Sequence, residues 1–172
     1  MSKAVFGIAT TCAQAEAIVD SLKIAGFSNN DISVLLPDKD GTRDFAHEKN
    51  TKAPEGAAAG AGTGGVVGGV LGWLVGIGSL AIPGVGPFVA AGPIMAALSG
   101  AAVGSAVGGL TGALVGLGIP EFEAKRYEGK LKQGNILISV HSKDSKETDR
   151  AEQILKNAHA QDISSATESG VK

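Results

Sequence analysis

The chain has 172 residues, a formal net charge of −2 and one cysteine. The length favours one domain, or one domain with an insertion. The charge balance gives no basic field for a nucleic-acid partner, and a single cysteine excludes an internal disulfide. Charge is nevertheless distributed very unevenly, because residues 56–120 contain no charged side chain and no histidine but hold most of the glycines.

The first 37 residues predict one βαβ unit. Residues 3–10 alternate between two faces, which is typical of a strand. Thr11 can cap a helix that runs from about Ala13 to Ala25, and residues 31–37 form a second alternating run. We therefore expect residues 1–37 to form the first half of a sheet domain.

Residues 38–55 are polar and rich in turn formers, so we expect a linker before the uncharged block. Within residues 56–120, glycine recurs at every fourth position in two ladders. The first ladder is Gly56, Gly60, Gly64, Gly68, Gly72 and Gly76, and the second is Gly100, Gly104, Gly108, Gly112 and Gly116. Residues four apart share one helix face. Each ladder therefore predicts a groove for close helix packing, as in helices that associate within lipid.

A cluster of prolines and glycines interrupts the block and predicts a hairpin turn at residues 83–93. The turn residues are Pro83, Gly84, Gly86, Pro87, Gly92 and Pro93. Proline inside a helix removes a hydrogen bond and clashes with the preceding turn. We therefore expect two helices, over 56–82 and 94–118, that form an antiparallel glycine-zipper hairpin. Each helix would be about 37 Å long, enough to cross a hydrocarbon core of about 30 Å.

The residues that flank the block indicate an orientation. Lys125, Arg126, Lys130 and Lys132 follow the block, whereas the expected tip carries no positive charge. By the positive-inside rule, the polar domain is then cytoplasmic and the hairpin lies in the membrane. The same four side chains are candidate contacts with the membrane surface. Glycine and alanine drive insertion only weakly, so a soluble cytoplasmic assembly that buries its hairpins remains an open alternative.

The C-terminal part predicts a second unit of strands and helices over residues 121–167. Residues 121–132 predict a charged helix that either lies on the headgroup surface or packs against the sheet. A strand over 136–141, a helix from a Ser145 cap to about Ala158, and a strand over 162–167 follow. Residues 168–172 are expected to fray.

Without the block, the element order is β-α-β followed by β-α-β. This order is typical of an α+β, ferredoxin-like split βαβ sandwich, with four antiparallel strands and two helices on one face. The helical hairpin would be inserted between the second and third strands. Such a connection tolerates a long insertion because the entropy of loop closure grows slowly with length.

The motifs that could carry chemistry are weak. Residues 60–65 satisfy the GxGxxG pattern, but no strand precedes them and no acidic residue follows about 20 positions later. His47, His141 and His159 are scattered, and Cys12 is alone, so their spacing indicates neither a metal site nor a catalytic triad. We expect no enzymatic activity, no cofactor and no metal.

Three groups of motifs carry a family resemblance. The first lies within residues 5–34 and includes Val5-Phe6-Gly7 and Ala25-Gly26-Phe27, the second is residues 82–87 with 91–93, and the third is residues 118–129 followed by 134–140. These motifs are spread along most of the chain, and in them the chain resembles the general stress protein 17M-like (YflT-type) domain family of bacteria. The resemblance implies a stress-associated protein with a central glycine-zipper hairpin, and it implies no reaction.

The leading hypothesis is therefore a non-enzymatic, stress-associated bacterial membrane protein that self-assembles through its glycine-zipper helices. One alternative is a soluble homo-oligomeric shell or filament with buried zippers. Another is an accessory subunit of a larger membrane complex, in which the ferredoxin-like domain docks a protein partner. The expected partners are thus a second copy of the chain, a lipid bilayer and a protein, but not nucleic acid.

Overall fold

The computed structural model describes residues 3–37, 78–82, 86–94 and 109–167. These residues form an α+β fold. In chain order the elements are β1 (Lys3–Ala9), α1 (Cys12–Ile24), a 3₁₀ turn (Asn29–Asp31), β2 (Ile32–Pro37), β3 (Gly78–Ile82), β4 (Gly86–Ala91), α5 (Gly109–Gly116), α6 (Glu121–Lys132), β5 (Ile136–Ser142), α7 (Ser145–Asn157) and β6 (Gln161–Thr167). The mixed class expected from the sequence is confirmed.

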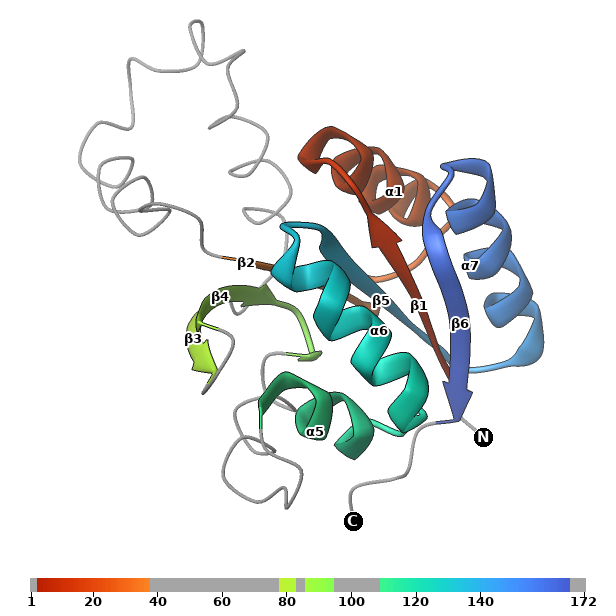
Figure 1. The fold of residues 1–172 in the computed structure, drawn as a ribbon. Helices are drawn as coiled ribbons and strands as arrows, with labels where there is room; N and C mark the ends of the chain where they lie inside the picture. Colours follow the sequence, from red (N-terminus) through yellow and green to blue (C-terminus); the bar gives the residue numbers. More distant parts are fainter. Residues whose placement is uncertain (1–2, 38–77, 83–85, 95–108, 168–172) are drawn as a thin grey trace, which may run out of the picture.

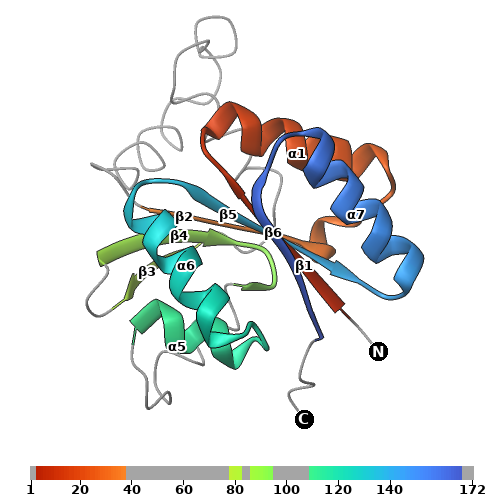
Figure 2. The same ribbon diagram turned by 45° about the vertical axis from the view of Figure 1, so that its right-hand side comes forward.

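The six described strands form one sheet in the order β3-β4-β2-β5-β1-β6. Every pair of neighbouring strands is antiparallel. Helices α1 and α7 cover one face of this sheet, and α5 and α6 lie on the other (Figure 1). The turned view separates the two helical layers on either side of the strands (Figure 2).

The central strands are buried on both faces because most side chains in both alternating sets are apolar. In β1, Val5 and Ala9 belong to the core beneath α1 and α7, whereas Phe6 and Ile8 belong to the opposite core. Side chains that alternate along a strand point to opposite faces. A strand that is apolar at every position therefore needs cover on both sides, and here each side has its own pair of helices.

The core beneath α1 and α7 is the first core. Its buried members are Val5, Ala9, Ala15, Ile18, Val19, Leu22, Phe27, Ile32, Val34, Leu36, Ala91, Ile136, Ile138, Val140, Ala151 and Leu155. The core beneath α5 and α6 is the second core. Its buried members are Ala4, Phe6, Ile8, Leu35, Phe88, Ala90, Ile94, Leu110, Ala113, Leu114, Ile119, Ala124, Tyr127, Leu131, Leu137 and Ala166. Part of the uncharged block thus packs inside the domain.

The strands and helices outside the uncharged block lie close to where the sequence predicts them. Thr11 caps α1 as expected, because its side chain accepts a hydrogen bond from the Gln14 amide. The cap of α7 is one residue earlier than predicted: Asp144, not Ser145, accepts from the amide of Glu147. A carboxylate is a strong N-cap acceptor and also complements the helix dipole, which explains the shift.

Two corrections concern the middle of the chain. Residues 78–82, expected at the end of a helix, form β3, and residues 86–91, expected in a turn, form β4. The described sheet therefore has six strands instead of four, and β4 adds to β2 through the pairs from Val34↔Ala91 to Pro37↔Phe88. The physical reason is length and packing: each run between turn formers is only strand-length, and pairing with β2 buries Phe88 and Ala90.

Gly92 lets the chain leave β4 in direct contact with β2. Its φ is +87°, and a Cβ atom there would lie 2.2 Å from the carbonyl oxygen of Ile32. Two residues later, the Ile94 amide donates a hydrogen bond of 3.1 Å to Ser33 Oγ. Only glycine fits this position, since it needs both a left-handed backbone and a missing side chain.

We predict that Gly92→Ala destabilises the protein more than Gly26→Ala does. Gly26 also has a positive φ, of +95°, but no atom lies within 4 Å of its added Cβ. Gly26→Ala should therefore cost only the left-handed strain, about 1–2 kcal/mol, whereas Gly92→Ala adds the clash with β2. Urea unfolding measures both. Equal losses of unfolding free energy would mean that the contact between Gly92 and β2 is absent.

Candidate functional site

The glycine-rich stretches join the described fold at two junctions, which together form the candidate functional site. The first glycine segment, residues 38–77, connects Pro37 at the end of β2 to Gly78 at the start of β3. The second glycine segment, residues 95–108, connects the buried Ile94 to Gly109 at the start of α5. Both segments lie outside the described residues, so the site is defined by how the sheet domain holds their ends.

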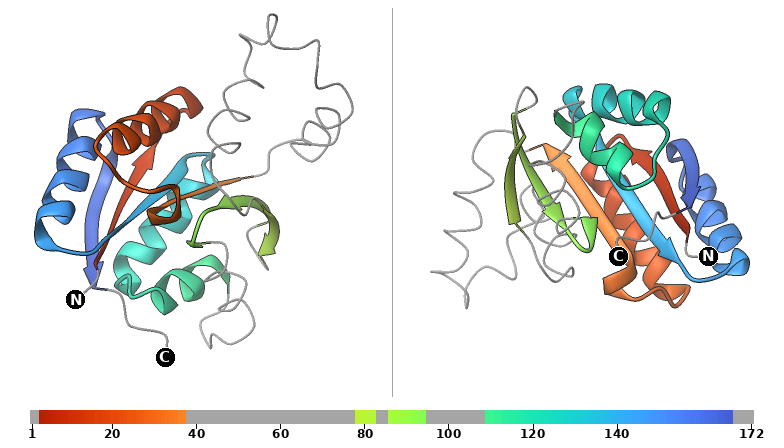
Figure 3. Two further views of the ribbon diagram at one scale, coloured as in Figure 1. Left: turned by 180° about the vertical axis from the view of Figure 1, so that it is seen from behind. Right: turned by 90° about the horizontal axis from the view of Figure 1, so that it is seen from below.

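The first junction holds both ends of its segment in one sheet. β2 and β3 each pair antiparallel with β4, so they run parallel to each other on either side of it. The register places Leu35 and Gly78 opposite the same residue, Ala90. Figure 3 shows β3 and β4 beside β2 at one edge of the sheet in its right-hand view. Residues 38–77 therefore begin and end on the same body.

The second junction is held by a hydrogen bond network between α5 and α6. The Thr111 amide donates to Glu128 Oε2 over 3.0 Å, and the Thr111 hydroxyl donates to the same oxygen. The other carboxylate oxygen of Glu128 lies 2.6 Å from Lys132 Nζ. Early helix amides lack partners within their own helix, so a carboxylate from α6 satisfies the start of α5 and fixes it against α6.

The pKa of Glu128 reflects these contacts. Burial by itself raises the pKa of this carboxyl, but the hydrogen bonds from Lys132 and Thr111 and the positive charge of Lys132 lower it further than burial raises it. The net effect holds the pKa of Glu128 below its usual value. The ionised carboxylate is therefore the form that ties α5 to α6.

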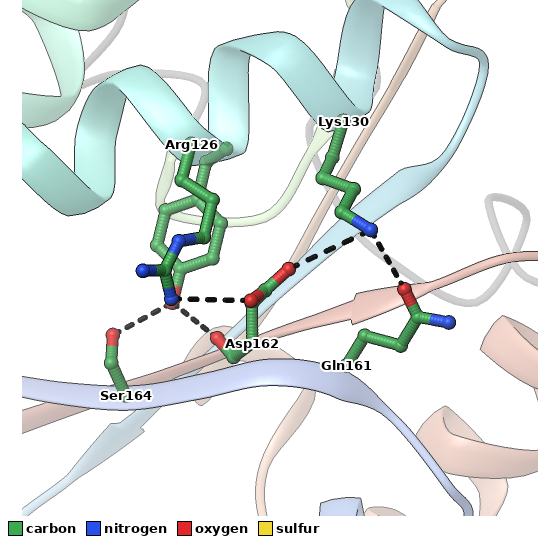
Figure 4. A network of polar contacts seen from close by, with 6 residues as sticks. Arg126, Lys130, Gln161, Asp162 and Ser164 are labelled. Atoms are coloured by element: carbon green, nitrogen blue, oxygen red, sulfur yellow. Dashed lines mark hydrogen bonds and ion pairs between the residues drawn. The ribbon is translucent and has the colours of Figure 1, made fainter.

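A second polar network joins the opposite side of α6 to the edge strand β6 (Figure 4). Arg126 Nη1 lies 3.2 Å from Asp162 Oδ1, and Lys130 Nζ lies 3.9 Å from Asp162 Oδ2. Lys130 also donates to Gln161 Oε1 over 3.0 Å. Exposed pairs of this kind contribute little individually, but here three contacts converge on one pair of neighbouring residues at the start of β6.

Tyr127 forms the buried centre of the contact between α6 and β6. Its side chain is 1% exposed, and its hydroxyl lies 2.7 Å from both the Asp162 carbonyl oxygen and Ser164 Oγ. Burial raises the pKa of the phenol to about 12, although the hydrogen bond with Ser164 opposes the rise. Nothing in the local sequence around Tyr127 indicated these contacts, because its partners lie about 35 residues away.

One small cavity lies beside the second junction. Its volume is about 60 Å³, and its lining is Phe6, Asp31, Ser33, Pro93, Ile94, Leu117, Ser139 and His141. Pockets for small-molecule ligands and cofactors usually measure roughly 300–1,000 Å³, so this cavity has room for little more than water. Among the residues that the structure describes, no group of three or more His, Cys, Asp or Glu side chains could hold a metal ion.

The structure describes only part of the two glycine ladders and of the expected turn. Gly112 and Gly116 lie in helix α5, where Gly112 is buried in the domain and Gly116 is exposed. Gly86 and Pro87 lie in β4 rather than in a turn, and Gly92 and Pro93 directly follow it. The rest lie outside the described residues, namely Gly56, Gly60, Gly64, Gly68, Gly72, Gly76, Gly100, Gly104, Gly108, Pro83 and Gly84.

The four basic residues expected at a membrane surface all have acidic partners. Lys125 pairs with Glu121, and Lys132 pairs with Glu128. Arg126 and Lys130 both pair with Asp162. Of the two placements considered for residues 121–132, the structure shows packing against the sheet, through the buried side chains Ala124, Tyr127 and Leu131.

The outer side of α6 is less polar than its charge suggests. Phe122 is 71% exposed, and the Arg126 guanidinium carbon lies 4.8 Å from the centre of its ring.

Among the described helices, none combines the length and the apolar character needed to cross a bilayer. Comparison of the chain with family models, curated proteins and solved structures gave no match.

We predict that Glu128→Gln loosens α5 and reduces the pH dependence of stability. Hydrogen bonds to a charged group contribute about 1.5–3 kcal/mol, so the variant should lose roughly 2 kcal/mol of unfolding free energy at neutral pH. Because the folded pKa is lowered, this stability is present above the unfolded pKa and is lost as pH falls through the folded pKa. Urea unfolding at pH 7 and at successively lower pH measures both effects.

Glu121→Gln is the matched control for Glu128→Gln. It removes the acid of an exposed pair with Lys125 in the same helix and in the same i,i+4 spacing. We expect it to leave the unfolding free energy at pH 7 unchanged. A loss as large as that of Glu128→Gln would show that general helix electrostatics, rather than the link to Thr111, stabilise this region.

We predict that the phenol of Tyr127 titrates near pH 12 in the folded protein. An unfolded tyrosine has a pKa of about 10, so stability should fall as pH rises from about 10 to 12, where only the unfolded chain releases its proton. The protein contains one tyrosine, so tyrosinate absorbance reports this residue alone. Tyr127→Phe should remove the absorbance change and flatten the alkaline loss of stability. Titration near pH 10 without unfolding would contradict the burial of this side chain.

Proposed function

We propose that this chain is a non-enzymatic, stress-associated bacterial protein whose sheet domain presents two glycine segments that join copies of the chain into a homo-oligomer. The proposal is supported by how the domain holds the ends of the glycine segments, together with the amino-acid composition of those segments. Both ends of each segment are fixed to one domain, and residues 56–77 and 95–108 contain no charge. The stress-associated role comes from the motif resemblance.

The proposal also assigns a ferredoxin-like arrangement to the core of the domain. The strands β2, β5, β1 and β6 are adjacent in that order, with α1 between β1 and β2 and α7 between β5 and β6. A split βαβ sandwich has this order and this placement of helices. In this interpretation β3, β4 and α5 belong to the insertion between β2 and β5, and the insertion completes the second core.

The composition of the segments favours contact between copies. An uncharged, glycine-rich stretch exposed to water at this length aggregates unless something covers it. Glycine every fourth residue, as in the ladder from Gly56 to Gly76, lets two backbones approach closely. A second copy of residues 56–77 or of residues 95–108 provides a matching surface without opposing charges.

The anchored ends limit how these segments can meet a bilayer. Residues 56–77 are long enough for one helical pass of about 33 Å. One pass would leave Gly78 on the far side from Pro37, although both lie in one sheet. Residues 95–108 would reach about 21 Å as a helix, less than the roughly 30 Å of a hydrocarbon core. We therefore propose that any lipid contact is made from one side of the membrane.

Association with the bacterial inner membrane is the second candidate function, and the absence of charge from residues 56–77 favours it. Lysis without detergent, an alkaline wash and flotation on a density gradient separate the two candidates. Soluble particles of high mass support a self-contained assembly with buried glycine ladders. Recovery in the lipid fraction supports the membrane candidate.

We predict that Gly68→Leu and Gly108→Leu disrupt the assembly, because leucine fills the groove that close backbone contact needs. Light scattering after size-exclusion chromatography measures the mass. Gly129→Leu is the matched control, since Gly129 lies in α6 with no atom within 4 Å of an added Cβ. Unchanged mass in both ladder variants would contradict assembly through the ladders, and a monomeric parent protein would contradict the proposed function.

A further inference from the structure

The two edges of the described sheet differ in how they are protected against pairing with another strand. At one edge, β6 has a register shift against β1 and a positive φ of +48° at Asp162. The same aspartate is charged and is held by Arg126 and Lys130. Irregular backbone and charge are devices that keep an edge strand from pairing with another chain.

The opposite edge strand, β3, has neither device. Its five residues, Gly78–Ile82, contain no charge and no proline. The pairing with β4 is regular over all five positions, from Gly78↔Ala90 to Ile82↔Gly86. Because residues 56–120 are uncharged, the chain on either side of β3 also lacks charges that would repel a second strand.

Two prolines determine which backbone groups of β3 face outward. Proline has no amide hydrogen, so it fits an antiparallel ladder only where the amide points away from the neighbour. Pro37 of β2 lies opposite Phe88, so Phe88 directs its amide and carbonyl to the other side, toward Leu80 of β3. Pro87 of β4 lies opposite Ala81, so these two residues form a pair without hydrogen bonds. Both prolines therefore indicate the same alternation of bonded and non-bonded pairs. Because hydrogen-bonded and non-bonded pairs alternate, Ser79 and Ala81 direct their amides and carbonyls outward.

We propose that β3 pairs antiparallel with β3 of a second copy, about a two-fold axis at Leu80. Ser79 of each copy then lies opposite Ala81 of the other, and the two pairs exchange four backbone hydrogen bonds. This inference rests on the proposed function, because it names one interface of the homo-oligomer. It is independent of the glycine ladders, which can join copies elsewhere.

A second copy fits this edge better than a different partner does. Antiparallel pairing about a two-fold axis is self-complementary, so one strand provides both halves of the interface. The edge has no charge with which to select a charged partner, and two uncharged copies of Gly78–Ile82 meet without repulsion. The pairing would extend the described sheet continuously from one copy into the next.

A disulfide test follows from the register. In the proposed dimer, Leu80 faces Leu80 of the second copy as a non-bonded pair, with Cα atoms about 4.5 Å apart, within the range that a disulfide bridges. In a Cys12→Ser background, Leu80→Cys should form an intermolecular disulfide on mild oxidation, seen as a dimer on a non-reducing gel. Ala81→Cys is the matched control, because its Cα atoms would be about 8 Å apart in the dimer.

A proline test then measures whether the pairing holds the assembly together. Ala81→Pro removes an outward amide without removing a hydrogen bond to β4, so the assembly mass should fall at least twofold at unchanged thermal stability. Leu80→Pro removes a hydrogen bond within the sheet and should lower the melting temperature, which tests the inferred alternation.

The outcomes distinguish this inference from the proposed function. A monomeric parent protein contradicts both. An assembly that Gly68→Leu or Gly108→Leu disrupts, with no Leu80→Cys crosslink and no effect of Ala81→Pro, overturns the β3 pairing alone. A lower melting temperature for Ala81→Pro at unchanged mass also overturns it, since the edge would then be covered by the same chain.

Discussion

The structure depends on a sheet whose central strands are largely apolar on both faces. β1, β2 and β5 are buried at nearly every position, so neither face can be left to water. Helices α1 and α7 cover one face, and α5, α6 and Ile94, which follows β4, cover the other. Burial of large apolar side chains contributes roughly 1.5–3 kcal/mol each. The inserted segment is therefore part of the domain, because its described residues complete the second core.

Besides the shared second core and the pairing of β4 with β2, individual contacts attach the insertion for specific chemical reasons. Gly92 allows the chain after β4 to lie close to the β2 backbone, and Ser33 Oγ accepts a hydrogen bond from the Ile94 amide. Glu128 supplies the carboxylate that satisfies the start of α5. These contacts hold the ends of the second glycine segment, and the pairing of β2 and β3 with β4 holds the ends of the first, so all four ends lie on the same body. Under the proposed function, the segments that contact a second copy or a bilayer leave one domain and return to it.

Local sequence signals predicted the elements that depend on local interactions. The Thr11 cap, the apolar alternation of β1 and the bounds of α6 follow from neighbouring residues. The sequence did not reveal β3 and β4, because short runs rich in glycine and alanine suit a helix or a strand equally until a partner strand is known. The links from Thr111 to Glu128 and from Tyr127 to Ser164 join residues distant in the chain. No spacing rule contains such pairs, so the geometry at the junctions could not be predicted.

The most direct test asks whether residues 86–91, which the sequence predicts to lie in a turn, pair with β2 in the sheet of the intact protein. Leu35 and Ala90 are register partners in β2 and β4 and are both buried. In the full-length Cys12→Ser chain, Leu35→Cys with Ala90→Cys should form an intramolecular disulfide that leaves no free thiol and preserves cooperative unfolding. We expect this disulfide to close, since the paired Cα atoms lie within the range that a disulfide bridges. Two thiols that remain free in the oxidised, folded protein would contradict it, because β4 would then lie away from β2.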